Sequence, residues 1–129
     1  MAKRRKVLTI PGRKRGNADL NDGVTIGNLV FSSVLTGVDM ETQKIPTDPV
    51  RQAELLFQNI RAFMEAAGGS VDDIAHVTLY LREGESRKPF DDEWNKMFPD
   101  VDDRPARHRV SHPLRPERIY EVDLIAVLS

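Results

Sequence analysis

The chain has 129 residues and a formal net charge of −1, with 40% hydrophobic and 30% charged residues, which is typical of one globular domain with its own core. It contains no cysteine, so disulfide bonds, thiol nucleophiles and cysteine-ligated metals are excluded. No apolar run approaches the roughly 20 residues of a membrane span and the N-terminus has no apolar signal region, so we expect a cytoplasmic protein.

The charge is unevenly distributed along the chain. Residues 1–15 contain seven basic residues and no acidic one, whereas the remainder holds twelve basic and twenty acidic residues. A basic arm can bind the phosphates of a nucleic acid, but this one has no aromatic residues among its charges. We therefore favour a solvated terminus. Within a single globular domain, residues 1–22 form the basic arm and first strand, and residues 23–129 form the main body.

The first half of the chain predicts three strands and a long helix. Residues 6–10 predict a first strand that ends at Pro11-Gly12. Residues 23–26 and 29–35 predict a hairpin around Gly27-Asn28, a dipeptide favoured in two-residue turns. A helix is expected from residue 49 to residue 67, between the capping residue Asp48 and two glycines. Its apolar face repeats every three or four residues and consists of Ala53, Leu56, Phe57, Ile60, Phe63, Met64 and Ala67.

The second half repeats a strand–helix pattern. Residues 70–73 form a capped turn before a strand at 74–81, in which Ala75, Val77, Leu79 and Leu81 should face the helices. Residues 86–98 predict a shorter helix, and strands follow near 105–112 and 118–127. This order predicts an α+β fold, a six-stranded mixed sheet with two helices packed on one face.

The last two predicted strands carry pairs of charged residues. Arg107 and Arg109 share one face of a strand, and Glu121 and Asp123 share one face of the next, because strand side chains alternate. A guanidinium can hold a carboxylate with two hydrogen bonds, and a nearby carboxylate can position or deprotonate water. From spacing alone, we favour a cross-strand ladder of ion pairs without any chemistry over a substrate site.

Other chemical motifs are missing from the sequence. His108 and His112 lie four apart, which suits zinc on a helix but separates them by roughly 13 Å on a strand. There is no phosphate-binding loop, dinucleotide fingerprint or nucleophile elbow, and no base is evident for Ser32 or Ser33. We therefore expect no metal site and no serine triad.

Five segments carry a recognisable pattern, namely residues 27–33, 39–42, 58–81, 104–107 and 121–126. In order, they resemble the second hairpin, the turn after it, the first helix with its following strand, the arginine-bearing strand and the C-terminal strand of the RidA/YjgF family. This family is also called the L-PSP endoribonuclease family. The resemblance spans residues 23–127.

This resemblance implies a chorismate-mutase-like fold and a homotrimer with clefts at the subunit interfaces. In the enamine/imine deaminase branch, the arginine at the Arg107 position grips a substrate carboxylate, and the glutamate at the Glu121 position helps to place or activate water. Water attacks an imine carbon, ammonia leaves and a 2-oxo acid results. The resemblance implies no metal or organic cofactor, and 2-aminoacrylate is the usual substrate.

Several positions depart from the family pattern. Asp19-Leu20 replaces a Pro-Tyr, so Leu20 stands where a pocket tyrosine is expected, and the segment from Ser33 replaces a Ser-Gly-Gln. Asp91 replaces an asparagine on the second helix, and Arg109 adds a charge two residues after Arg107. We expect Leu20, Ser33, Asp91 and Arg109 to join Arg107 in binding substrate. The added arginine suggests a substrate with a second anionic group, of the 2-aminomuconate type.

Three functions follow from these patterns. The first is a deaminase-like hydrolase acting on a carboxylate-bearing enamine or imine. The second is a non-catalytic trimer that binds small carboxylate ligands in the same cleft, which the lost tyrosine and Ser-Gly-Gln favour. The third, RNA binding or cleavage, rests on the family's name and the basic arm, and we favour it least.

Overall fold

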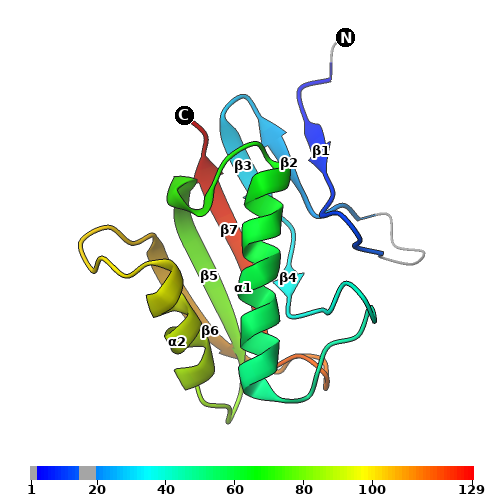
Figure 1. The fold of residues 1–129 in the computed structure, drawn as a ribbon, viewed down its shortest axis with the longest axis vertical. Helices are drawn as coiled ribbons and strands as arrows, with labels where there is room; N and C mark the ends of the chain where they lie inside the picture. Colours follow the sequence, from blue (N-terminus) through cyan, green and yellow to red (C-terminus); the bar gives the residue numbers. More distant parts are fainter. Residues whose placement is uncertain (1–2, 15–19) are drawn as a thin grey trace.

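The computed structural model describes residues 3–14 and 20–129, which form one mixed β-sheet covered by two helices (Figure 1). The helices α1 (Pro49–Ala66) and α2 (Lys88–Met97) lie side by side on the same face of the sheet, as predicted. The strands are β1 (Lys6–Leu8), β2 (Gly23–Ile26), β3 (Leu29–Ser32), β4 (Leu35–Thr36), β5 (Ile74–Arg82), β6 (Ala106–His112) and β7 (Tyr120–Val127).

The order of the strands across the sheet differs from their order in the chain. The path is β1-β2-β3-β7-β5-β6, and β4 adds to β7 beyond the end of β3. All pairs are antiparallel except β5 with β6, which are parallel because α2 connects them as a crossover. The C-terminal strand β7 therefore lies in the middle of the sheet, and β6 lies at its edge.

The predicted strand at residues 29–35 is interrupted, so the sheet has seven strands rather than six. The pairing with β7 passes from Phe31↔Ile125 to Leu35↔Val122, which leaves one extra residue on the β3–β4 side. An extra residue bends a strand and leaves ladder groups unpaired. The side chain of Ser32 compensates, because its Oγ accepts a hydrogen bond of 2.8 Å from the backbone N–H of Leu124.

Helix α1 matches the prediction closely because its signals are local. The side chain of Asp48 accepts a hydrogen bond from the backbone N–H of Val50 at 3.3 Å, and Pro49 occupies the first turn. The apolar face is buried against the sheet, with Leu56, Phe63 and Met64 fully inaccessible. Burying such side chains contributes roughly 1.5–3 kcal/mol each to folding.

Strand β5 begins with a β-bulge that corrects one prediction. Val77, Leu79 and Leu81 face the helices as expected, but Ala75 is exposed and Ile74 is buried in its place. The pairing with β7 shifts between Ile74, which pairs with Ala126, and His76, which pairs with Ile125. Strand β5 therefore has one extra residue at this point. Before the strand, the turn η1 (Val71–Asp73) is closed by a reciprocal capping box with Ser70.

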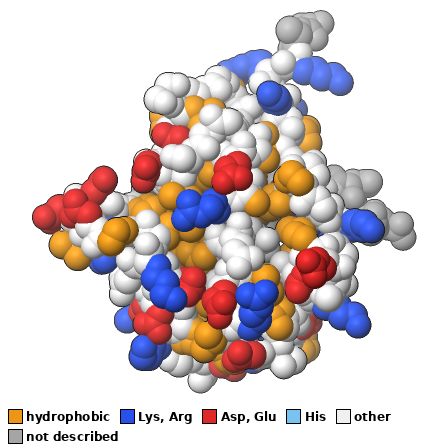
Figure 2. Space-filling model, in the orientation of Figure 1, with side chains coloured by type: hydrophobic (Ala, Val, Ile, Leu, Met, Phe, Trp, Pro, Cys, Tyr) orange, Lys and Arg blue, Asp and Glu red, His pale blue; other side chains and the backbone are white. Residues whose placement is uncertain are grey.

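The two faces of the sheet differ in how they are covered. The helix-covered face holds the core and, on its outer surface, interspersed acidic and basic side chains (Figure 2). The opposite face, called the open face below, carries half-exposed apolar side chains on β3 and β7, namely Leu29, Phe31, Ile125 and Val127. Neither helix of the described chain has the length and hydrophobicity that a membrane-spanning segment requires.

Candidate active site

Arg107 lies on the helix-covered face of β6, where it packs against α2. Its Nη2 is 2.9 Å from Oδ1 of Asp91, and its guanidinium carbon lies 4.9 Å from the ring centre of Trp94 and 5.4 Å from that of Phe90. A guanidinium over an aromatic ring is attracted by the ring's negative face. The side chain of Arg107 is still 21% exposed, so a fixed guanidinium is partly open to a ligand.

Asp91 holds two arginines at once. In addition to Arg107, its Oδ2 accepts a hydrogen bond of 2.8 Å from Nε of Arg87, one turn earlier along the chain. Asp91 also lies in the first turn of α2, where the helix dipole favours a negative charge. The predicted site residue Asp91 is thus in direct contact with the predicted anchor Arg107.

Arg109 follows on the same face of β6. It pairs in register with Leu79, as Arg107 pairs with Val77, so both arginines lie on the helix-covered side. Arg109 is exposed, and within residues 3–14 and 20–129 its guanidinium has no carboxylate partner. The prediction that the two arginines share a face is confirmed, and Arg109 contributes an unbalanced positive charge beside the anchor.

Glu121 lies on the open face, at a cavity of about 370 Å³. One oxygen of Glu121, Oε1, is 3.1 Å from Nη1 of Arg118, which neutralises part of its charge. Beside it, the hydroxyl of Tyr80 donates a hydrogen bond of 3.1 Å to Oδ2 of Asp123. The cavity is lined by Val34, Tyr80, His112, Pro113, Leu114, Arg115, Glu121 and Asp123.

The environment of Tyr80 favours its protonated form. Burial raises the pKa of Tyr80, and the negative charge of Asp123 and the hydrogen bond to it raise that pKa further. The phenol therefore keeps its proton at neutral pH and donates a hydrogen bond to Asp123. Of the two carboxylates Glu121 and Asp123, only Asp123 accepts a hydrogen bond from a hydroxyl group of the described residues.

Arg107 and Glu121 lie on opposite faces of the sheet within one chain. Glu121 pairs with Tyr80 of β5 on the open face, whereas Arg107 contacts the rings of α2 on the other. Strand β5 also separates β6 from β7, so the alternative of a cross-strand ion-pair ladder between these charges is wrong for a single chain. A small ligand on one chain cannot touch both side chains.

The remaining predicted site residues are distributed differently. Ser33 lies in the break between β3 and β4, next to Val34 of the Glu121 cavity, and its backbone N–H donates to the carbonyl of Asp22 at 2.8 Å. Leu20 is 67% exposed and lines neither the Arg107 contact nor the Glu121 cavity. Asp19, which precedes Leu20 and replaces the proline of the family's Pro-Tyr, lies outside the described residues.

Sequence reasoning missed Gln52, which positions the start of β7. Its Oε1 accepts hydrogen bonds from the backbone N–H groups of Ile119 and Tyr120 at 2.7 and 3.3 Å. Its Nε2 donates to the carbonyls of Pro46 and Glu117. The available signal was a polar residue one turn before Leu56, in line with the apolar face of α1.

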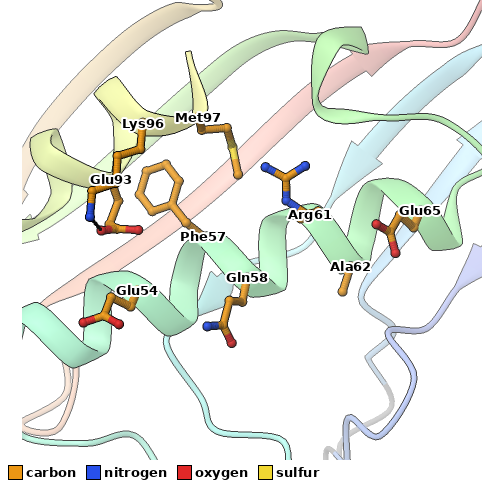
Figure 3. A pocket seen from close by; sticks show the side chains of 9 residues that line it. All are labelled: Glu54, Phe57, Gln58, Arg61, Ala62, Glu65, Glu93, Lys96 and Met97. Carbon is orange, nitrogen blue, oxygen red and sulfur yellow. Dashed lines mark hydrogen bonds and ion pairs between the residues drawn. The ribbon is translucent and has the colours of Figure 1, made fainter. Parts of the chain in front are cut away.

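A second groove, of about 360 Å³, lies between α1 and α2 (Figure 3). Phe57 and Met97 lie between the helices, Arg61 extends toward them, and Lys96 closes one wall by an ion pair of 3.0 Å with Glu93. None of the predicted site residues lines this groove. In the described part of the chain, no cluster of three histidine, aspartate or glutamate side chains could hold a metal ion.

Comparison with known proteins identifies the family of this arrangement. The model of a family described as Endoribonuclease L-PSP matches residues 14–128, nearly the whole chain. The chain belongs to the RidA/YjgF/L-PSP family. The resemblance seen in the sequence is thereby confirmed, and so is the fold that it implied.

Relatives within the RidA/YjgF family include named deaminases. A 2-iminobutanoate/2-iminopropanoate deaminase of Dermatophagoides farinae is 25% identical over 127 residues, covering 97% of this chain and 98% of that protein. The crystal structure of RidA from the Antarctic bacterium Psychrobacter sp. PAMC 21119 is 26% identical with a TM-score of 0.85, over 96% of this chain and all of that one. Escherichia coli TdcF, crystallised with bound serine, is 28% identical with a TM-score of 0.85, over 96% and 99% of the two chains.

Proposed function

We propose that this protein is an enamine/imine deaminase-like hydrolase, which releases ammonia from a carboxylate-bearing imine of the 2-aminoacrylate or 2-aminomuconate type and yields a 2-oxo acid. The observation that carries the proposal is a partly exposed guanidinium, fixed at Arg107 by an ion pair and two rings, in a chain of this family. Full-length similarity to an imine deaminase supports the same reaction.

The proposed chemistry needs positioning and proton transfer only. Arg107 holds the ligand carboxylate, which places the adjacent imine carbon beside a water molecule. Glu121 accepts a proton from that water as its oxygen attacks the carbon, and the proton passes to the nitrogen. The product of this addition carries a hydroxyl and an amino group on the same carbon. The hydroxyl proton then passes to the nitrogen through Glu121, the carbon–nitrogen bond breaks, ammonia leaves, and the oxygen forms the carbonyl of the 2-oxo acid. An enamine first takes a proton on carbon to become the imine.

This chemistry requires two copies of the chain. Since Arg107 and Glu121 lie on opposite faces of one sheet, we propose that Arg107 of one protomer closes the Glu121 cavity of the next in a homotrimer. The apolar side chains of the open face support this arrangement, because Phe31 and Ile125 would be covered by a neighbouring copy.

The experiment that tests the proposal measures ammonia release from 2-aminoacrylate formed in situ and from 2-aminomuconate, in excess of spontaneous hydrolysis. Arg107→Ala should lower kcat/KM by about 10²-fold, since truncating one partner of a charge pair costs about 2–5 kcal/mol. Arg107→Lys, which keeps the charge but loses the bidentate fork, should be intermediate. Arg61→Ala, an exposed arginine on α1, is the matched control. Equal rates for wild type and Arg107→Ala would contradict the role of Arg107.

A second function, binding of small carboxylates without turnover, is favoured by one observation. Asp91 already occupies part of the Arg107 guanidinium, which weakens its pull on a substrate carboxylate. Calorimetry with 2-oxo acids separates the two functions. Binding that depends on Arg107, together with no ammonia release from either imine, would select the binding protein.

A further inference from the structure

A third cavity, of about 420 Å³ and called the basic cavity below, lies where three segments of the chain meet. Its walls come from the N-terminal segment, the loop before α1 and the loop before β7. The lining contains three basic residues and one acidic residue, namely Arg13, Lys44, Arg118 and Glu117. Two positive charges therefore remain after the acidic residue is counted. None of the site residues predicted from the sequence lines this cavity.

The loop that carries Lys44 into the basic cavity is held in one conformation. Gln43, the residue before it, has a φ of 60°, in the left-handed region that a residue with a side chain rarely adopts. Its side chain secures this conformation, because Nε2 donates to the carbonyls of Gly12 and Met40 at 2.8 and 2.6 Å and Oε1 accepts from the backbone N–H of Lys14 at 3.0 Å. Backbone strain of this kind persists where the surrounding contacts fix it, and it is common at binding sites.

Arg118 connects the basic cavity with the Glu121 cavity. Its Nη1 is 3.1 Å from Oε1 of Glu121, which lines the one cavity, while Arg118 itself lines the other. The Nε of Arg118 is buried and has no hydrogen-bond partner among the described residues. A buried donor without an acceptor is costly, so an unpaired group of this kind points to a further partner from outside the chain. The ion pair with Glu121 thus leaves the guanidinium with a donor still to be satisfied.

We propose that the basic cavity binds the phosphate group of a small molecule and that this anion competes with Glu121 for Arg118. A phosphate monoester carries a charge of about −1.5 to −2 at neutral pH, which matches the two positive charges left in the lining. Guanidinium and ammonium groups are the usual side-chain ligands of phosphate. An anion that draws Arg118 away leaves the Glu121 carboxylate without the ion pair that orients it, and so slows the proposed reaction. Only this last step rests on the proposed function.

The site is tested by calorimetry with inorganic phosphate and with glycerol 3-phosphate, at an ionic strength held constant with sodium chloride. The two probes separate the free anion from a phosphate monoester. Wild type should bind at least one of them with a dissociation constant of about 1 mM or below. Lys44→Gln removes one cation of the lining and should weaken that binding about tenfold.

Lys6→Gln is the matched control, because Lys6 is an exposed lysine on β1 that does not line the basic cavity. It makes the same chemical change and should bind the probes as wild type does. The proposal is overturned if wild type binds neither probe saturably, or if Lys44→Gln and Lys6→Gln have the same affinity.

A second pair of variants tests the competition for Arg118. Glu121→Gln removes the competing charge and should tighten phosphate binding about fivefold or more. Asp123→Asn makes the same change two residues along on the same face of β7, but Asp123 pairs with the hydroxyl of Tyr80, so its effect should be much smaller. Equal tightening by the two variants would reveal a general effect of charge and would overturn the competition.

Failure of the inference and failure of the proposed function give different results. Under both proposals, the bound anion lowers ammonia release by wild type, and Lys44→Gln needs about tenfold more of it for the same effect. If phosphate binds but wild type releases no ammonia from either imine, the proposed function is wrong and the site stands. If wild type releases ammonia at a rate that saturating anion does not change, the regulation is wrong and the proposed function stands.

Discussion

At the scale of single residues, the two oxygens of Glu121 have different surroundings. Oε1 is paired with Arg118 at 3.1 Å, whereas Oε2 has no hydrogen-bond partner among the described residues. The ion pair fixes the orientation of the carboxylate on the cavity wall. In the proposed reaction, Oε2 is therefore the oxygen that receives the proton of the attacking water.

A second single residue, Tyr120, is expected to make the free energy of unfolding fall as the pH rises above 10. Its ring is fully buried, its hydroxyl donates to the carbonyl of Ser86 at 2.9 Å, and burial raises its pKa to about 12. An unfolded tyrosine ionises near pH 10. Between pH 10 and 12 the unfolded chain releases this proton while the folded chain keeps it, so the free energy of unfolding falls as pH rises.

Tyr120→Phe tests this dependence. Urea unfolding at a fixed protein concentration should show a loss of about 1 kcal/mol at pH 8, from the missing hydrogen bond to Ser86. Above pH 10 the variant should lose stability less steeply than wild type. Parallel curves for the two proteins from pH 8 to pH 11.5 would show that Tyr120 does not cause the dependence.

At the scale of elements, one buried side chain of α1 ties the helix to the start of β7. Gln52→Ala leaves two N–H groups and two carbonyls without their partner, so we expect a loss of about 2–4 kcal/mol in the free energy of unfolding. Activity should fall as well. Gln52 accepts a hydrogen bond from the backbone N–H of Tyr120, and Glu121 is the next residue along β7, so loss of this contact disturbs the position of Glu121. Urea unfolding with parallel ammonia assays measures both.

The control for that prediction is Gln58→Ala, on the exposed side of the same helix. It makes the same chemical change without breaking a buried contact, so its effect should stay within about 0.5 kcal/mol. Equal losses for the two variants would mean that helix propensity, and not the contacts of Gln52, determines the result.

The same scale explains which parts of the fold were predictable. Helix α1 and the hairpin at Gly27 follow from caps, periodicity and turn residues within a few positions of each other, and both were predicted correctly. The break between β3 and β4 was missed because it depends on register against β7, some 90 residues away. Gln52 was missed for the same reason, since its partners at Glu117, Ile119 and Tyr120 are remote in sequence.

The site itself was predictable in part. The alternation of side chains along a strand correctly predicted that Arg107 and Arg109 share one face of β6. It also correctly predicted that Glu121 and Asp123 share one face of β7. Alternation within a strand does not determine strand order, however. It therefore gave no sign that β5 separates the two pairs or that they face opposite sides of the sheet.

At the scale of the whole molecule, a site shared between protomers predicts complementation. Arg107→Ala and Glu121→Gln chains should each be nearly inactive alone. Co-expressed in equal amounts, they should recover about a quarter of wild-type activity, because about one in four interfaces of a closed ring joins an intact Arg107 to an intact Glu121. Ammonia release from 2-aminoacrylate measures the recovery.

Two controls accompany the mixing experiment. Co-expressing Arg107→Ala with Arg107→Lys, neither of which has an intact arginine, should give no more than the average of the two separate rates. Light scattering should report a trimer for each variant. Trimers that recover no activity on mixing would place the whole site within one chain and would contradict the proposed arrangement.

The distribution of charged groups over two faces of one sheet also has an evolutionary consequence. The proposed anchor Arg107 and its partner Asp91 lie on the helix-covered side of the sheet, whereas Glu121 lies on the open face, where it is paired with Arg118. Under the proposed function, a lineage can therefore exchange the residues around Arg107 and accept a new acid while Glu121 stays unchanged. Selectivity and reactivity can drift apart in such a protein, each constrained by different neighbours.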